Sequence, residues 1–589
     1  MASRDLDDME VEFHGLQAEP TDFQNQGIQI SPYQVLNPDG GYVYKTTLEL
    51  QLCSFICTGS SSRNYRTRSR EIRLEDIPFV SELIQDGLGE RVVELLLHFQ
   101  YRACRQDPLL FVLAICCRSS DRQTKRAGYN ALPSICRIPT QLFKFLSFCQ
   151  KINQKNSLSK GWGRAHRKAI CDWYHSYGTS ETKLKLLALH ITKYSKRHGW
   201  RHKTVMRLAH LNVKEEEDPA LKYLVILAVK GKQYADSTTF MENQRKREFY
   251  QTSTLKKISD LLSSIETAKH TKDVSQVKRL ILEHRLVREH IPTCFLNERE
   301  VWLALARHMP VTALIRNLGK MSKLEIFKRS NSEEKPSFEE YLALEKLKNK
   351  ELITKEKVHP FTYMLAINQY KKGENRSKSL QWPIYPQICS ALKEGLYLSF
   401  ENIKPTNKRF LVALDISKSV EESVTVVGSP SLQALDVAAF MLSLTIRTEQ
   451  NCHAIIFSNN RATALPIRPD DDIEVVAEKI KDLRSSPREV SADASLPFKY
   501  AIEKKKIYDV FIIYTDSYAT SGTPHPSQAL QFYRQSSGKT DAKLVVCNLA
   551  CSDVSIGDID DPLTLTVCGF DSYVPQIISN FINGNFYSS

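Results

Sequence analysis

The chain has 589 residues, a length that favours two to four domains at roughly 150 residues each over one compact core. Its 25% charged and 42% hydrophobic residues are usual for globular proteins, which excludes wholesale disorder and fibrous repeats. The net charge of +14 is segmented, with −7 in residues 1–40, +26 in residues 41–400 and −5 in residues 401–589. A basic body of this size favours a polyanionic partner, either nucleic acid or an anionic membrane.

Residues 1–40 are acidic and polar and contain several prolines, so we expect a tail rather than a domain. Neither a signal peptide nor an uncharged apolar stretch of membrane-spanning length is present, so no membrane association is predicted. The fourteen cysteines include no CxxC pair, which predicts buried thiols in a reducing compartment. We therefore expect a cytoplasmic protein, with the nucleus as an additional location.

Residues 41–400 are predicted to form a helical domain. Apolar residues recur there at helical spacing in segments separated by short connectors, which is typical of an α-solenoid or a bundle. No fixed sequence period is present, so any repeat is structural. The clearest segments are Val80–Phe99, Pro108–Cys117, Thr140–Lys151, Gly163–Tyr174, Leu184–Tyr194, Ser275–His290, Glu298–Arg307 and Phe338–Lys348.

Residues 401–589 are predicted to form a doubly wound α/β domain. Apolar strands alternate with segments of helical periodicity, which indicates βαβ units around a mostly parallel sheet. The predicted strands are Arg409–Asp415, Ala454–Ser458, Tyr508–Thr515, Lys543–Asn548 and Thr564–Cys568.

Oxygen-bearing side chains follow two of these strands. Asp415, Ser417 and Ser419 alternate outward from the first strand tip, and Asp516 ends another strand that should reach the same edge. Such ligands suit a hard divalent cation such as Mg²⁺. Alternatively, the same groups serve only in capping and turn hydrogen bonds.

Two basic clusters lie in the helical part. In Gly161–Trp173 the helical spacing places Trp162, Ala165, Ala169 and Trp173 on one face, and Arg164, Arg167, Lys168 and Cys171 on another. In Lys193–Lys203 cations alternate with aromatic residues, a mixture that suits phosphate contact and base stacking. Each cluster alone is more typical of a solvated helix face, but the two together favour nucleic acid. The predicted RNA contacts are Arg164, Arg167, Lys168, Lys183, Lys185, Arg201, Lys203 and His202, the last by hydrogen bonding or stacking.

Several blocks recur in the order of a known family. Gly161–Trp173, Gly199–Lys203, Glu283–His290 and Met309–Met321, followed by Val567–Asp571, resemble the TROVE module and von Willebrand factor A domain of the Ro/SS-A ribonucleoprotein autoantigens. The resemblance covers about residues 41–589. It implies a ring of HEAT-like helical repeats closed by the A domain, which holds small noncoding Y RNAs outside and the 3′ ends of misfolded RNAs in its hole. It also implies ring-lining contacts by Arg285, Arg288 and Arg316.

The resemblance to A domains also bears on the metal. Their metal-ion-dependent adhesion site needs a loop threonine, and the matching loop Ser491–Ser495 has Ala492 at that place. Ser491 would replace the threonine only if the loop slipped by one residue. The departure from the family pattern puts Mg²⁺ binding in doubt and leaves RNA binding in place.

No catalytic signature supports an enzyme. The sequence lacks a Walker loop, an HExxH motif and a GxSxG elbow, so we expect a non-catalytic, monomeric protein within a ribonucleoprotein. Its predicted partners are small noncoding RNA and proteins that dock on the A domain. The alternative is a protein-interaction scaffold that docks partners through the A domain and has only non-specific RNA affinity.

Overall fold

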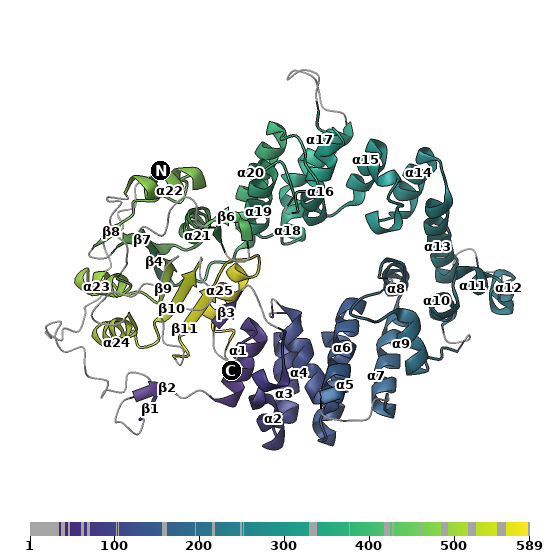
Figure 1. Cartoon of the computed structure of the whole chain (residues 1–589), viewed down its shortest axis with the longest axis horizontal. Coiled ribbons are helices and arrows are strands. Elements are labelled where there is room, and N and C mark those ends of the chain that lie inside the picture. The colour runs from purple at the N-terminus through teal and green to yellow at the C-terminus, as the bar shows by residue number, and fades with distance from the viewer. Residues whose placement is uncertain are drawn as a thin grey trace. The chain divides into compact units, whose positions relative to one another are not determined.

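The computed structural model divides the chain into two compact units that interleave along the sequence (Figure 1). The helical unit comprises Ile72–Leu352 and Gly373–Ala391, and the α/β unit comprises Met1–Glu71, Ile353–Lys372 and Leu392–Ser589. The predicted boundaries at residues 40 and 400 instead cut the sequence into consecutive stretches. The structure describes residues 34–36, 42–44, 47–60, 64–66, 71–101, 103, 105–155, 162–194, 196–214, 218–247, 250, 253–328, 338–375, 377–416, 425–426, 429–458, 461–483, 493–515, 526–549 and 561–586.

The helical unit consists of successive helices that pack against their neighbours in the chain. In its first half α3 also packs against α5, α4 against α6, α5 against α7, and α7 against α9, so these helices contact the next but one in the chain. This stacking confirms the predicted helical repeats. The helices are α2 (Pro78–Gln85), α3 (Gly89–Phe99), α4 (Gln106–Arg118), α5 (Arg122–Ile135), α6 (Pro139–Lys155), α7 (Arg164–His175), α8 (Glu181–Lys193), α9 (His202–Ala209), α10 (Pro219–Lys230), α11 (Lys232–Asp236), α12 (Thr239–Arg245), α13 (Thr254–His270), α14 (Val274–His284), α15 (Arg299–His308), α16 (Val311–Lys323) and α17 (Phe338–Leu347), with the 3₁₀ helices η2 (Leu74–Asp76), η3 (Ser176–Thr179), η5 (Arg288–His290) and η6 (Phe295–Asn297).

Two predicted helices are shorter than their apolar periodicity suggests. The segment Val80–Phe99 is divided into α2 and α3 by Gly87, whose φ of 78° lies in the left-handed region. The segment Ser275–His290 stops being α-helical at His284, because Arg285 adopts a φ of 51° at the C-terminal cap of α14. Left-handed residues end both helices while the apolar pattern continues beyond them.

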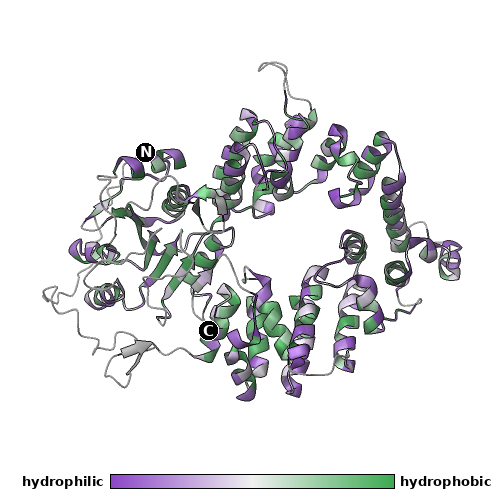
Figure 2. Ribbon diagram, in the orientation of Figure 1, coloured by the Kyte–Doolittle hydropathy of each residue, from purple (hydrophilic) through white to green (hydrophobic). Residues whose placement is uncertain are grey.

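The α/β unit is built on a seven-stranded sheet in the order β3-β11-β10-β9-β4-β7-β8. All its pairs are parallel except β7 with β8, which confirms the predicted fold class. Figure 2 shows that the strands are largely hydrophobic, as expected for a sheet that helices cover on both faces. The strands are β3 (Asn64–Arg66), β4 (Arg409–Asp415), β7 (Asn451–Phe457), β8 (Ala462–Ala464), β9 (Val510–Thr515), β10 (Lys543–Asn548) and β11 (Thr564–Cys568).

The remaining elements of this unit are helices and two small hairpins. They are α1 (Leu48–Thr58), α19 (Pro360–Lys371), α21 (Ala434–Thr448), α22 (Ile473–Asp482), α23 (Leu496–Glu503), α24 (Pro526–Ser536), α25 (Val574–Ile582), η7 (Phe400–Asn402), β1 (Gln34–Leu36), β2 (Tyr42–Tyr44), β5 (Thr425–Val426) and β6 (Ser429–Gln433). The division between the units falls within α18 (Lys350–Lys355) and α20 (Pro386–Ser399).

A strand from the start of the chain completes the sheet. Tyr65 in β3 pairs with Val567 in β11, its side chain is fully buried, and its hydroxyl donates to Asp571 Oδ2 at 2.9 Å. The predicted helical domain, residues 41–400, included β3, whereas β3 belongs to the α/β sheet. The pairing joins residues about 500 positions apart, which no local pattern reveals.

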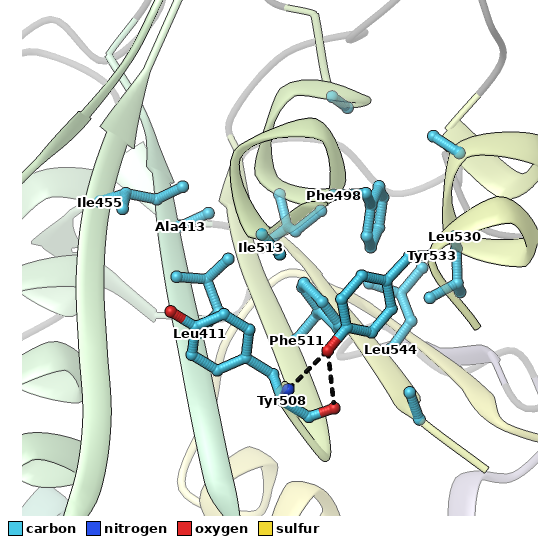
Figure 3. Close-up of a cluster of buried hydrophobic side chains, with 14 of the residues drawn as sticks. Leu411, Ala413, Ile455, Phe498, Tyr508, Phe511, Ile513, Leu530, Tyr533 and Leu544 are labelled. Carbon is cyan, nitrogen blue, oxygen red and sulfur yellow. Dashed lines mark hydrogen bonds between the residues drawn. The ribbon is translucent and has the colours of Figure 1, made fainter. Parts of the chain in front are cut away.

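One face of the sheet packs against α23 and α24 in a closed apolar core (Figure 3). Phe498 of α23 and Tyr533 of α24 both contact Phe511 of β9, with ring centroids 4.9 and 4.8 Å apart. The Tyr533 hydroxyl accepts the Tyr508 N–H at 2.5 Å and donates to the Tyr508 carbonyl at 3.3 Å. This core fixes the parallel strands in register, so that Asp415 and Thr515 end side by side.

Candidate nucleic-acid interface

The N-termini of α7 and α9 lie next to each other in the helical unit. Trp162 precedes α7 and Trp200 precedes α9, and their ring centroids are 5.7 Å apart. Trp162 also meets His166 edge-on at 4.8 Å. Because the aromatic contact joins the two segments that enter these helices, the cations of both predicted clusters come together on one surface.

Both helices begin without a side-chain cap. The N-cap residues are Gly163 for α7 and Arg201 for α9, neither makes a side-chain capping bond, and neither helix has an acidic residue in its first turn. By contrast, α8, α10 and α13 are capped by the side chains of Ser180, Asp218 and Ser253. The free N–H groups and the helix dipole make uncapped N-termini favourable places for an anion.

Five exposed cations surround these two N-termini, namely Arg164, Arg167, Lys168, Arg201 and Lys203, which we call the α7/α9 basic surface. Within the described part of the chain, none of their side chains forms an ion pair. Residues 162–214 contain twelve Lys and Arg against two acidic residues. The surface therefore carries an uncompensated positive charge.

Two further predicted contacts lie on the neighbouring helix α8. Lys183 is exposed, and its Nζ lies 3.5 Å from the Ser176 carbonyl. Lys185 pairs with Glu181 at 2.7 Å, and Glu181 also accepts from Lys257 at 2.9 Å. These hydrogen bonds lower the pKa of Glu181 to about 2. Lys185 is therefore already neutralised by a carboxylate, unlike the five cations of the α7/α9 basic surface.

The structure corrects the prediction for His202. Its side chain is only 4% exposed, its Nδ1 lies 2.9 Å from the Tyr174 hydroxyl, and its ring packs edge-on against Phe143. Burial lowers the pKa of His202 to about 3, so the ring is neutral. A ring in this position cannot stack on a base, and it instead anchors the first turn of α9.

The predicted faces of α7 are also shifted. Ala165 is exposed, although the sequence analysis placed it on the packed face, and His166 is buried in its stead. The buried positions His166, Ala169, Ile170 and Trp173 follow helical spacing, so a histidine belongs to the apolar stripe. The predicted packed face contained no histidine, so the burial of His166 was not expected.

The three arginines predicted to line a ring, which we call the second basic group, lie at the C-terminal cap of α14, in η5 and in α16. Arg285, Arg288 and Arg316 are exposed, and Arg288 donates to Asn317 Oδ1 at 3.3 Å. Lys320, which was not among the predicted contacts, lies nearby, and its pKa is lowered by burial and by the cations Lys323 and Arg288. The effect of Lys323 and Arg288 on the pKa of Lys320 indicates a local concentration of positive charge.

Little of the predicted metal site lies in the described part of the chain. Ser417, Ser419, Asp516 and Ala492 all fall outside it. Asp415 is fully buried, and its Oδ2 accepts from the Thr515 hydroxyl at 2.8 Å.

Asp493, the one carboxylate of the loop Ser491–Ser495 that the structure describes, binds protein groups with both of its oxygens. Asp493 Oδ1 accepts from the Ser495 N–H and hydroxyl, and its Oδ2 accepts from Lys499. Among the described residues, no group of three His, Cys, Asp or Glu side chains could hold a metal ion. The described donors therefore do not assemble a cation site.

The described helices include none that is both long and apolar enough to cross a membrane.

Comparisons with known proteins cover both units. The TROVE domain family matches residues 37–379, and the Ro60 vWA domain family matches residues 409–582. The chain is 30% identical to the RNA-binding protein RO60 of Caenorhabditis elegans over 94% of this chain and 90% of that protein. It is 27% identical to the RNA-binding protein RO60 of Deinococcus radiodurans over 94% and 96% of the two chains.

A solved structure agrees with these sequence matches. The crystal structure of the RO (RSR) protein of Deinococcus radiodurans superposes with a TM-score of 0.77 at 27% identity, covering 91% of this chain and all of that one. With a TROVE domain followed by a Ro60-type vWA domain along nearly its whole length, the chain belongs to the Ro60 family.

Proposed function

We propose that this protein binds RNA through the α7/α9 basic surface and acts as a non-catalytic component of a cytoplasmic ribonucleoprotein. The observation that supports this proposal most directly is the cluster of five cations around two adjacent, uncapped helix N-termini. None of these cations has an ion-pair partner among the described residues. Two relatives are named RNA-binding proteins, which supports the same assignment. Arginine and lysine would neutralise phosphates, and the half-buried Trp162 and Trp200 offer aromatic surface beside them.

The RNA classes that we propose are small noncoding Y-type RNAs on this surface and the unpaired 3′ ends of misfolded RNAs at Arg285, Arg288 and Arg316. The α7/α9 basic surface suits a folded RNA, because its cations are spread over two helices and address backbone phosphates rather than one base. The second basic group lies on different helices, so the two contacts are separable by mutation. Separate sites for folded RNAs and for the 3′ ends of misfolded RNAs would suit a role in noncoding RNA quality control.

RNA affinity is expected to fall steeply with salt. Six phosphate contacts to single-stranded RNA give a slope of roughly −4 in log K against log salt. The double variant Arg167→Gln/Lys168→Gln should weaken binding of all RNAs and flatten this slope by about 1.4, since two contacts are lost. Filter-binding titrations at several salt concentrations measure both quantities.

A matched control removes lysines that already have carboxylate partners. Lys256 pairs with Asp260 and Lys278 with Glu300, so Lys256→Gln/Lys278→Gln makes the same charge change away from the α7/α9 basic surface. An equal loss of affinity in both double variants would show that only total charge matters. That result would reject the α7/α9 basic surface as the RNA site.

We also propose that RNA binding does not depend on a divalent cation. Asp415 already accepts a hydrogen bond from Thr515, and Ala492 stands where A domains use a threonine ligand. RNA affinity should therefore be unchanged by chelation and by Asp415→Asn. Calorimetry showing submicromolar Mg²⁺ binding that Asp415→Asn abolishes, together with loss of RNA affinity on chelation, would refute this.

A further inference from the structure

Two exposed aromatic rings lie on one face of α17 in the helical unit. Phe338 begins the helix and is 66% exposed, and Tyr341, one turn further on, is 52% exposed. Phe338 is the only exposed phenylalanine in the part of the chain that the structure describes. The opposite face of α17 is buried through Ala343, Leu344 and Leu347, so the packing of the helix does not require the two rings. We call Phe338 and Tyr341 the α17 aromatic face.

The C-terminal end of α15 holds α17 in place. Lys346 of α17 donates to three carbonyls there, those of Ala306, Arg307 and Met309, at 2.8, 2.6 and 3.3 Å. A cation is favourable at this position because the last carbonyls of a helix have no partner within it. The guanidinium of Arg307 in turn lies over the Phe338 ring, 5.7 Å from its centroid. The most exposed ring of the α17 aromatic face is therefore in contact with a cation.

Further basic groups gather at the same end of α15. Arg307 and His308 close α15 and are exposed, as is Arg285 at the C-terminal cap of α14. Partial burial, together with the charges of Arg285, Lys346 and Arg307, lowers the pKa of His308. These three cations therefore lie close enough to one another to concentrate positive charge beside the α17 aromatic face.

We propose that the α17 aromatic face stacks on unpaired bases of single-stranded RNA. The phosphates next to these bases bind Arg285 and Arg307. Every base has a π face, so the contact tolerates any sequence but requires bases that are free of a partner strand. This inference rests on the proposed function and adds base contacts to an RNA site that has so far been assigned only cations.

The charge around the rings favours RNA over a protein segment as the occupant. Two exposed rings alone would suit an apolar protein surface equally well, but cations beside aromatic rings suit a ligand that has both phosphates and flat bases. Glu345, one turn beyond Tyr341, pairs with Lys348 at 3.2 Å, so its carboxylate is already compensated. A strand of RNA therefore matches both the charge and the shape of this surface.

Replacing the rings by leucine tests the stacking. The variant Phe338→Leu/Tyr341→Leu of the full chain keeps an apolar helix face but has no π surface, so it should bind a plain single-stranded RNA about tenfold more weakly. Its affinity for a blunt-ended RNA duplex should be unchanged, because paired bases do not reach the rings. The salt slope should also be unchanged, since no phosphate contact is lost.

Two controls identify the ring as the cause. The exchange variant Phe338→Tyr/Tyr341→Phe keeps both rings and should keep the affinity. Tyr234→Leu removes another exposed ring, 47% exposed on α11 with Lys230 Nζ 4.1 Å from its centroid, and should have no effect. An unchanged single-strand affinity in the leucine variant, or an equal loss in either control, would overturn the inference. The first of these results would leave the α17 aromatic face as a protein contact.

A second measurement uses the unmodified chain. A single-stranded RNA that carries 5-iodouridine couples on irradiation to aromatic rings stacked on that base, so mass spectrometry should find links to Phe338 or Tyr341. Links to other residues only, or no binding of the single strand, would overturn the inference. If these links form but Arg167→Gln/Lys168→Gln has no more effect than its matched control, the α7/α9 basic surface fails as the RNA site while the stacking stands.

Discussion

Lowering the pH from 7 to 5 is expected to destabilise the helical unit by about 4 kcal/mol through His166 and His202 alone. Both rings are buried and neutral, and burial lowers the pKa of each to about 3. Arg118 contributes to this shift at His166, and His190 contributes at His202. In the unfolded chain each imidazole regains a pKa near 6.5.

The direction follows from proton binding. Between pH 6.5 and 3 the imidazoles of His166 and His202 bind protons in the unfolded chain but stay neutral in the folded chain. The free energy of unfolding therefore decreases as the pH falls through this range. Each histidine then contributes about 2 kcal/mol of lost stability at pH 5, and the full stability is present above pH 6.5. His190 and His290, whose pKa values burial lowers to about 4, act in the same direction in the helical unit.

Tryptophan fluorescence during urea titration at pH 7 and pH 5 measures this effect. All five tryptophans belong to the helical unit, so the signal reports that unit alone. Tyr174→Phe/His202→Leu removes both partners of one buried pair and should reduce the pH effect by about 2 kcal/mol. His270→Gln, which alters an exposed histidine, should leave the pH effect unchanged. Identical pH effects in the double variant and the unmodified chain would contradict the burial of a neutral His202.

Arg534→Met is expected to destabilise the α/β unit by about 3–5 kcal/mol, because it removes the buried guanidinium that pairs with the Asp561 carboxylate. The two side chains are 1% and 4% exposed, and Arg534 Nη2 lies 2.9 Å from Asp561 Oδ2. Arg534 Nε and Nη2 also donate to the Ala542 carbonyl, immediately before β10. The variant therefore disturbs both a buried charge and the start of a central strand.

Hydrogen exchange of peptides covering β9 and β10 should accelerate by about 10²–10³ or more, while tryptophan fluorescence keeps its urea midpoint. Arg534→Met/Asp561→Asn removes both charges of the pair and should recover much of the loss, since the amide oxygen can still accept from the Leu563 N–H and the amide NH2 can donate to the Thr564 hydroxyl oxygen. Lys479→Met breaks the half-exposed pair with Asp471 and should cost at most about 1 kcal/mol. Similar losses of stability in Arg534→Met and Lys479→Met would show that the buried pair contributes no more to stability than the half-exposed pair.

The elements of the sheet could be predicted closely because their signal is local. Three predicted strands, Arg409–Asp415, Lys543–Asn548 and Thr564–Cys568, have the observed bounds. Continuous apolar runs flanked by polar residues define a strand that is buried on both faces. Helix ends at Gly87 and Arg285 were missed, since a left-handed backbone residue leaves the apolar periodicity on either side intact.

The candidate RNA surface was predictable in part. Arg164, Arg167, Lys168, Arg201 and Lys203 are exposed as predicted, because the charge of long cationic side chains is costly to bury. His202 was misplaced, since a neutral imidazole can be buried when a hydroxyl partner is available, and sequence gives no sign that Tyr174 is that partner. Residue type thus predicts the exposure of a permanent charge but not that of a titrating ring.

By itself the sequence determined the two kinds of architecture, the separation of charge along the chain and the family, because apolar periodicity, composition and ordered motifs are properties of consecutive residues. Only the tertiary structure decided that β3 joins β11, that Trp162 meets Trp200, and that two uncapped helix N-termini share one basic surface. Each of these depends on packing between segments separated by tens to hundreds of residues. Their free energy comes from burial of side chains against partners that a local pattern cannot specify.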